Sequence, residues 1–157
     1  MKKFHIIFLT LAMMIIPSIT FGNVIDKLNE TGKFTKLNET LMKSGLSENL
    51  KDKGPFTVFA PLDDAFSAIS AKTYYGLLRE ENKDKLVNIL GRHVFLKKIN
   101  SSEIDGEIKL KAINGEEITI KKVNGIVYIN EAEVVTADVE ASNGVIHFIN
   151  RVLQPLN

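Results

Sequence analysis

Apolar residues in the first half of the chain recur at intervals of three and four, which predicts short amphipathic helices. One such stretch starts at Asn23 and is interrupted at Gly32, and a second follows it and stops at Ser44-Gly45. Their apolar positions are Val24, Ile25 and Leu28, and then Phe34, Leu37 and Leu41. We therefore expect two short helices at the start of the folded domain.

A β-rich run at residues 56–60, too apolar to be half exposed, interrupts this helical spacing. It follows Gly54-Pro55 and is rich in β-favouring residues, so it predicts a buried strand. Helical spacing then returns, and we expect Asp63 or Asp64 to cap one helix and Thr73 to cap another. A further helix ends with a histidine on its apolar stripe, which consists of Leu86, Ile89, Leu90 and His93.

From residue 108 onward the apolar positions alternate with polar ones, and this period of two indicates strands. A two-residue loop at Asn114-Gly115 would pair an apolar face with a polar one. A three-residue loop ending at Gly115 instead sets Ile108 opposite Ile120 and Leu110 opposite Ile118. We therefore predict the three-residue loop, with Gly115 in the left-handed conformation.

Two later turns complete the strand region. A two-residue turn at Asn124-Gly125 places Ile120 opposite Ile129 and Lys122 opposite Val127. A turn at residues 142–144 leads into the run Val145-Ile146-His147-Phe148-Ile149, which predicts another strand. Helices in the first half and strands in the second indicate one α+β domain, in which mostly C-terminal strands pack with several short N-terminal helices.

The first residues have the pattern of a secretory signal peptide, residues 1–22. Lys2 and Lys3 precede an apolar run, and Thr20 and Gly22 are the small residues of a cut after Gly22. The folded domain would then comprise residues 23–157. The alternative is an uncleaved anchor helix, because the stretch 4–21 approaches the length that spans a bilayer.

Composition limits the function classes. The chain has 157 residues, 45% hydrophobic and 25% charged, which suffices for one domain but not for two. It holds 20 Lys and Arg, two of them in the leader, so the mature protein would carry 18 basic and 19 acidic residues. This balance offers no field for nucleic acid or for anionic lipid. The absence of Cys means that the core alone must supply stability.

Two long segments resemble the signature boxes of fasciclin domains: GPFTVFAPLDDAF (Gly54 to Phe66) and SNGVIHFINRVLQP (Ser142 to Pro155). Between them LGRHVF (Leu90 to Phe95) resembles the Tyr-His segment of that family, and the resemblance extends over residues 23–155. It implies a compact domain in which a β-wedge packs beside a layer of helices. It also implies a role in cell adhesion, extracellular matrix or microbial envelopes, without enzymatic activity.

The resemblance points to a partner-binding element. In animal members an Asp followed by an aliphatic residue, just upstream of the second box, has been proposed to recognise integrins, and Asp138 and Val139 occupy that position. We expect the segment 136–141 to be a loop between strands. The alternative is that Asp138 turns the chain and Val139 fills the core. The Tyr-His element is less well matched, because Arg92 stands where Tyr precedes His93.

The residues offer little other chemistry. His93 and His147 are expected to be structural, hydrogen-bonded to backbone, and the alternative for His93 is a ligand role in a His/carboxylate metal site. No Cys is present for a zinc site, and no G-x-S-x-G elbow or phosphate-binding loop occurs. We therefore expect no catalytic residues, no metal and no cofactor.

Two charged groups have both a functional and a structural interpretation. Asp63-Asp64 could form a metal or acid/base pair, but helix capping is the simpler interpretation. Lysines on the outer face of the predicted hairpin could bind acidic polysaccharide, or could be a solvated strand face that discourages edge pairing. These lysines are Lys109, Lys111, Lys121 and Lys122.

The function we expect is that of an exported, non-catalytic binding module, periplasmic, secreted or at the cell surface. Its partner would be an envelope or extracellular protein or glycan, bound by a monomer or weak oligomer without membrane insertion. The alternative is a periplasmic protein that binds a small apolar ligand, and this would require an apolar cavity. An enzyme is the third class, and the sequence lacks its site chemistry.

Overall fold

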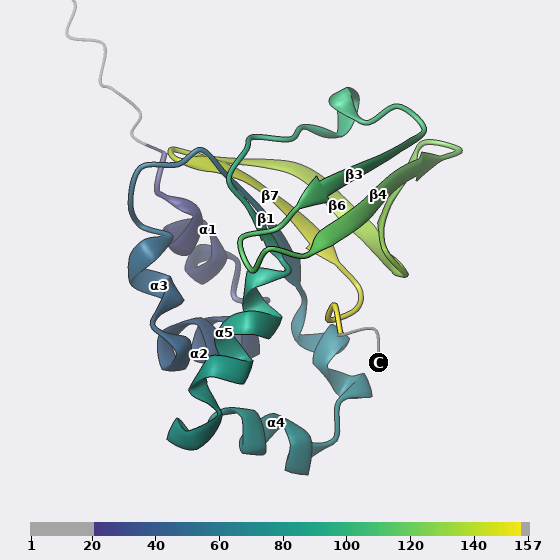
Figure 1. Cartoon of the computed structure of the whole chain (residues 1–157). Helices are drawn as coiled ribbons and strands as arrows, with labels where there is room; N and C mark the ends of the chain where they lie inside the picture. The colour runs from purple at the N-terminus through teal and green to yellow at the C-terminus, as the bar shows by residue number, and fades with distance from the viewer. Residues whose placement is uncertain (1–20, 155–157) are drawn as a thin grey trace, which may run out of the picture.

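The structure is a computed structural model that describes residues 21–154 (Figure 1). The helical elements are α1 (Val24–Thr31), α2 (Thr35–Ser44), α3 (Leu46–Asn49), the 3-10 helix η1 (Asp63–Ala68), α4 (Ala71–Leu77), η2 (Glu80–Asn82), α5 (Lys83–Gly91) and η3 (Ser101–Glu103). The strands are β1 (Phe56–Pro61), β2 (Val94–Phe95), β3 (Glu107–Lys111), β4 (Glu117–Val123), β5 (Ile126–Ile129), β6 (Ala132–Ala141) and β7 (Gly144–Ile149). The predicted signal peptide lies outside the described residues, except for Phe21 and Gly22.

The seven strands form one sheet in the order β2-β1-β7-β6-β5-β4-β3. β1 and β7 pair in parallel, and all other neighbouring strands are antiparallel. Figure 1 shows the helices gathered to one side of the central strands, while the hairpins from β3 to β6 curve away from them as a wedge. The predicted α+β architecture is therefore confirmed.

Strands β1 and β7 are the centre of the molecule, because all six residues of each are buried. Their side chains alternate between two apolar clusters, as the period of a strand requires. Val58 and Phe148 face the cluster under the helices, whereas Phe59 and Ile149 face the cluster inside the wedge. The ring of Phe34 meets that of Phe148 edge-on, with centroids 4.8 Å apart, and so fixes the helices to the sheet.

The predicted strand register is confirmed. Ile108 lies opposite Ile120 and Leu110 opposite Ile118, and Gly115 closes the three-residue loop with a φ of 89°. At the next turn Asn124 and Gly125 both have positive φ, at 52° and 80°, as a two-residue hairpin turn needs. The alternation of apolar and polar residues selected this register, because any slip by one residue exposes the apolar face.

Two predicted helix caps are wrong. The carboxylate of Asp63 accepts the backbone N–H groups of Thr35 and Lys36, at 3.2 and 2.8 Å, and so caps α2 instead of the element that follows it. Helix α4 is capped by Ser70, whose Oγ accepts the N–H of Thr73 at 3.1 Å. The cap is the residue that precedes a helix and binds an N–H inside the first turn, and Thr73 supplies that N–H.

Candidate partner-binding site

Strand β6 is irregular at the position of Asp138. Against β7, Thr136 pairs with Phe148 and Val139 with Ile146, so β6 contains one residue more than its partner over this interval. Asp138 takes up this β-bulge with a φ of 61°, a left-handed conformation that aspartate tolerates better than most residues. The expected loop over residues 136–141 is thus wrong, because the segment belongs to β6 and its bulge turns Asp138 away from the ladder.

The carboxylate of Asp138 is held by Ser101. Its Oδ1 accepts the backbone N–H of Ser101 at 2.7 Å, and its Oδ2 accepts the Ser101 hydroxyl. Ser101 opens η3, where the backbone N–H has no partner within the helix. Partial burial raises the pKa of Asp138, but the two hydrogen bonds from Ser101, aided by the positive charge of Lys122, bring the pKa below its ordinary value of 3.8. The exposed carboxylate is therefore charged at neutral pH and fixed in one orientation.

His147 connects the bulge to the segment before η3. Its Nδ1 accepts the backbone N–H of Asp138 at 3.1 Å, so the other ring nitrogen, Nε2, carries the proton and donates to the carbonyl of Ile99 at 2.7 Å. Burial lowers the pKa of His147 against the opposing effects of the Ile99 carbonyl and Asp138. The imidazole is therefore neutral at neutral pH and joins β6, β7 and residue 99.

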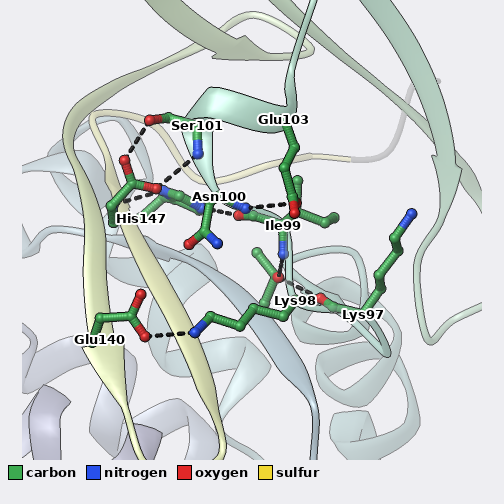
Figure 2. Close-up of polar contacts among 10 residues, drawn as sticks. Lys97, Lys98, Ile99, Asn100, Ser101, Glu103, Glu140 and His147 are labelled. Carbon is green, nitrogen blue, oxygen red and sulfur yellow. Dashed lines mark hydrogen bonds and ion pairs between the residues drawn. The ribbon is translucent and has the colours of Figure 1, made fainter.

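The segment that presents Ser101 is fixed at several further points, as Figure 2 shows. The hydroxyl of the buried Thr57 donates to the carbonyl of Lys97 and accepts the N–H of Ile99 at 2.8 Å. The ammonium of Lys98 lies 2.8 Å from the carboxylate of Glu140 on β6. These contacts join residues 97–101 to strands β1, β6 and β7, so Ser101 meets Asp138 in a preformed arrangement.

The structure places Asp138 and Val139 in different environments. Asp138 is exposed, whereas the half-buried Val139 packs against the apolar cluster under the helices. Of the two residues, only Asp138 therefore has an exposed side chain that is accessible to a partner.

A groove adds apolar surface beside the carboxylate. It measures about 360 Å³ and is lined by Ser101, Lys122, Gly125, Ile126, Val127, Glu133, Val134, Val135 and Ala137. Val135 and Ile126 are large apolar side chains that are 48% and 39% exposed. The ammonium of Lys122 donates to the carbonyl of Ser101 at 3.1 Å and so lies at this site. We call Asp138, Ser101, Lys122, Ile126 and Val135 together the Asp138 surface.

The predicted cluster of four lysines is wrong in one member. Lys109, Lys111 and Lys121 lie on the exposed outer face of the hairpin, but Lys122 belongs to the Asp138 surface. Each of the three outer lysines lies near a glutamate of the neighbouring strand: Glu107 is opposite Lys121, and Glu117 is opposite Lys111 and 4.0 Å from Lys109. This face is therefore mixed in charge.

His93 lies in the core at the end of α5. Its Nδ1–H donates to the carbonyl of Ile89 at 2.9 Å, and its Nε2 accepts the N–H of Leu153 at 3.0 Å. Burial lowers its pKa to about 4. Arg92, which stands where the family has Tyr, is also buried and forms an ion pair of 2.6 Å with Glu116. Neither residue is accessible to a partner on the surface.

The described residues offer no evident metal centre. Within residues 21–154 no three side chains of His, Asp or Glu are gathered closely enough to hold an ion. Asp63 caps α2, while the exposed Asp64 contributes its backbone carbonyl to Ser67. Between Phe21 and Gln154, no helix has the length and apolar character needed to cross a membrane.

Sequence reasoning missed the residues that hold Asp138 in place. Ser101 binds Asp138 across 37 positions of the chain, and Thr57 binds Ile99 across 42, so both contacts arise only through the fold. A Ser in an Asn-Ser-Ser stretch has the ordinary appearance of a turn. The one signal was the Asn100 to Glu103 spacing, which is typical of a capping box and marks the start of η3.

Comparison with known proteins gives consistent matches. The model of the fasciclin domain family matches residues 32–155. Protein sll1483 of Synechocystis is 48% identical over 128 residues, which are 81% of this chain and 69% of that protein. The transforming growth factor-beta-induced protein ig-h3 of Sus scrofa is 36% identical over 93% of this chain, which spans only 21% of that protein.

A solved structure shares the fold. It is a FAS1 domain pair from the insect cell adhesion molecule fasciclin I, with a TM-score of 0.75 and 21% sequence identity. The match covers 87% of this chain and 52% of that one. The likeness therefore concerns one domain of a pair.

Proposed function

This chain belongs to the fasciclin domain family, and from that membership we propose that it is an exported, non-catalytic module that binds an envelope or extracellular protein or glycan through the Asp138 surface. Family membership supports a binding role in general, since the solved domain pair comes from a cell adhesion molecule. Export is supported by the signal-peptide pattern of residues 1–22.

The observation that carries the proposal is the state of the Asp138 carboxylate. It is exposed yet fixed, because Ser101 donates one hydrogen bond to each of its oxygens. Each carboxylate oxygen can accept a further bond, so the group can receive charge-assisted hydrogen bonds from a partner Arg or Lys. It can equally complete the coordination of a cation that the partner holds. A fixed carboxylate loses little conformational freedom on binding, which favours affinity.

The groove beside Asp138 supplies the apolar part of the contact. Val135 and Ile126 are exposed on strands whose backbones are fixed in the sheet, so a partner can cover them without rearrangement of the domain. A single domain has a modest interface, so its binding is weak unless several copies meet the same partner. We therefore propose a monomer or weak oligomer whose attachment is strengthened by clustering.

The test starts with the capture of partners from intact cells by crosslinking, using the exported protein. Asp138→Asn removes the charge but keeps the shape: its amide oxygen can still accept the backbone N–H of Ser101, while its NH2 group can donate to the Ser101 hydroxyl, which then acts as the acceptor. We expect this variant to lose most of its captured partner with little change in Tm. The matched control is Glu131→Gln, which makes the same charge change at a side chain that is 88% exposed and outside the Asp138 surface.

Two results would contradict the proposal. One is undiminished capture by the Asp138→Asn protein when it is folded. The other is equal loss of capture by the Glu131→Gln control, since this would indicate a general effect of net charge and not a site.

A further inference from the structure

A second feature, remote from the Asp138 surface, is a cavity among the helices. It has a volume of about 210 Å³ and is bounded by α4, α5, η1, the end of β1 and residues 152–154. Figure 1 shows α4 crossing the lower end of α5, with the C-terminal segment approaching from the side of η1. The cavity is partly open to solvent, and the exposed Lys85 is among its lining residues, so a small molecule can enter it. An apolar occupant would gain packing contacts with its walls.

The walls are mainly apolar. Most of the fourteen lining residues are aliphatic or aromatic, among them Phe66, Ile69, Leu77 and Ile89. His93 also lines the cavity, but both of its ring nitrogens are bound to backbone, so it presents only its ring edge or face. Such a surface favours an apolar occupant, because water in the cavity would find few partners.

The charged residue at the edge of the cavity indicates that the occupant also has a polar group. Lys85 is the one charged side chain among the lining residues, and no carboxylate lines the cavity. Within the part of the chain that the structure describes, Lys85 forms no ion pair, and its side chain is exposed at the start of α5. An ammonium at the edge of an apolar cavity is complementary to a small molecule with an apolar body and one negative charge.

The volume of the cavity limits the size of the apolar part of the occupant. A cavity of about 150 Å³ lined by apolar side chains accepts benzene, so one of 210 Å³ has room for a somewhat larger group, an aliphatic chain of about eight carbons. From the volume, the lining and the position of Lys85, we infer that this cavity binds a medium-chain aliphatic carboxylate. The chain would lie between α4 and α5, and the carboxylate would meet Lys85 at the surface. This site is separate from the Asp138 surface and does not depend on it.

The probe is octanoate, titrated into the whole exported protein and followed by the NMR signals of the methyl groups of Ile69, Leu77 and Ile89. We expect saturable shifts that are confined to the cavity, and a rise in Tm with octanoate concentration. Acetate, which lacks the apolar body, should produce neither effect. Octanol, which lacks the charge, should bind the same methyl groups more weakly.

Variants separate the two parts of the interaction. Lys85→Gln should weaken octanoate binding about fivefold, the scale of an exposed ion pair, and leave octanol unchanged. Lys83→Gln, the same change on the same helix outside the lining, is the control and should have no effect. Leu77→Phe places a larger group in the cavity and should weaken both octanoate and octanol.

Several outcomes would overturn the inference, and the first needs no variant. The absence of saturable shifts in the wild-type protein at millimolar octanoate would exclude the site. Shifts spread over the surface, or equal octanoate affinity in Lys85→Gln and wild type, would show non-specific binding or a different polar contact. Asp138→Asn should bind octanoate normally, so failure of this inference and failure of the Asp138 surface are distinguishable.

Discussion

Acidification from pH 7 to pH 4.5 should weaken the fold through His93. The imidazole is fully enclosed, with Nδ1–H bonded to the Ile89 carbonyl and Nε2 bonded to the Leu153 N–H. Burial, and to a smaller extent the neighbouring Arg92, lowers its pKa from the ordinary 6.5 to about 4. A proton on Nε2 would also replace the acceptor that the Leu153 N–H requires. The native state therefore resists a proton that the unfolded chain accepts readily.

The sign and size of the effect follow from that difference in pKa. Between pH 6.5 and pH 4 the unfolded state binds more protons at this position, so the free energy of unfolding falls as the pH falls. The difference between a pKa of 6.5 in the unfolded chain and about 4 in the fold lowers the free energy of unfolding by about 1 kcal/mol at pH 5.5 and by about 2 to 3 kcal/mol at pH 4.5. Burial also lowers the pKa of His147, which adds to the loss in the same direction. Asp138 acts differently, because a lowered carboxylate pKa costs stability only as the pH falls further, through that pKa.

Urea denaturation at pH 7, 5.5 and 4.5 measures the loss, and His93→Asn isolates its source. The Asn side chain offers a donor near the position of Nδ1 but has no proton to gain, so the variant should start less stable and lose less on acidification. The difference between the two losses at pH 4.5 should be about 2 to 3 kcal/mol. An NMR titration of the His93 ring gives the pKa directly. Equal losses in the two proteins, or a ring that titrates near 6.5, would refute the reasoning.

Three further predictions concern the fold and the leader. Asp63→Ala should destabilise the protein by about 1 kcal/mol in urea denaturation because it uncaps α2, whereas Asp64→Ala should leave the free energy of unfolding unchanged. Gly144→Ala should lower the free energy of unfolding by about 3 kcal/mol or more, because a Cβ at this position would lie 2.0 Å from the carbonyl oxygen of Phe56. Gly76→Ala is the control: its Cβ would meet no atom within 4 Å, so it should not destabilise the fold. Mass spectrometry of the exported protein should find a chain that begins after Gly22, and a chain that still begins at residue 1 or 2 would contradict the predicted cleavage.

The arrangement of the strands could be predicted from the sequence because it depends on local rules. The alternation around Ile108 and Ile120 allowed one register, and Gly115 allowed one loop. The largely apolar, β-rich run at residues 56–60 correctly indicated a buried strand. Each of these features is decided by neighbours in the chain and by the need to bury one face.

The sequence alone also determined the family, through two long segments that resemble its signature boxes, but it did not determine the surroundings of Asp138. The carboxylate is defined by Ser101, by the bulge in β6 and by His147, and no local pattern connects these residues. The cap of α2 by Asp63 and the cavity beside Lys85 arise in the same way, from segments that meet only in the folded chain. A period of two or of 3.6 residues specifies which face of an element is buried. Hydrogen bonds between distant segments and gaps in the packing depend instead on how the elements are placed against one another, and only the tertiary structure decides that.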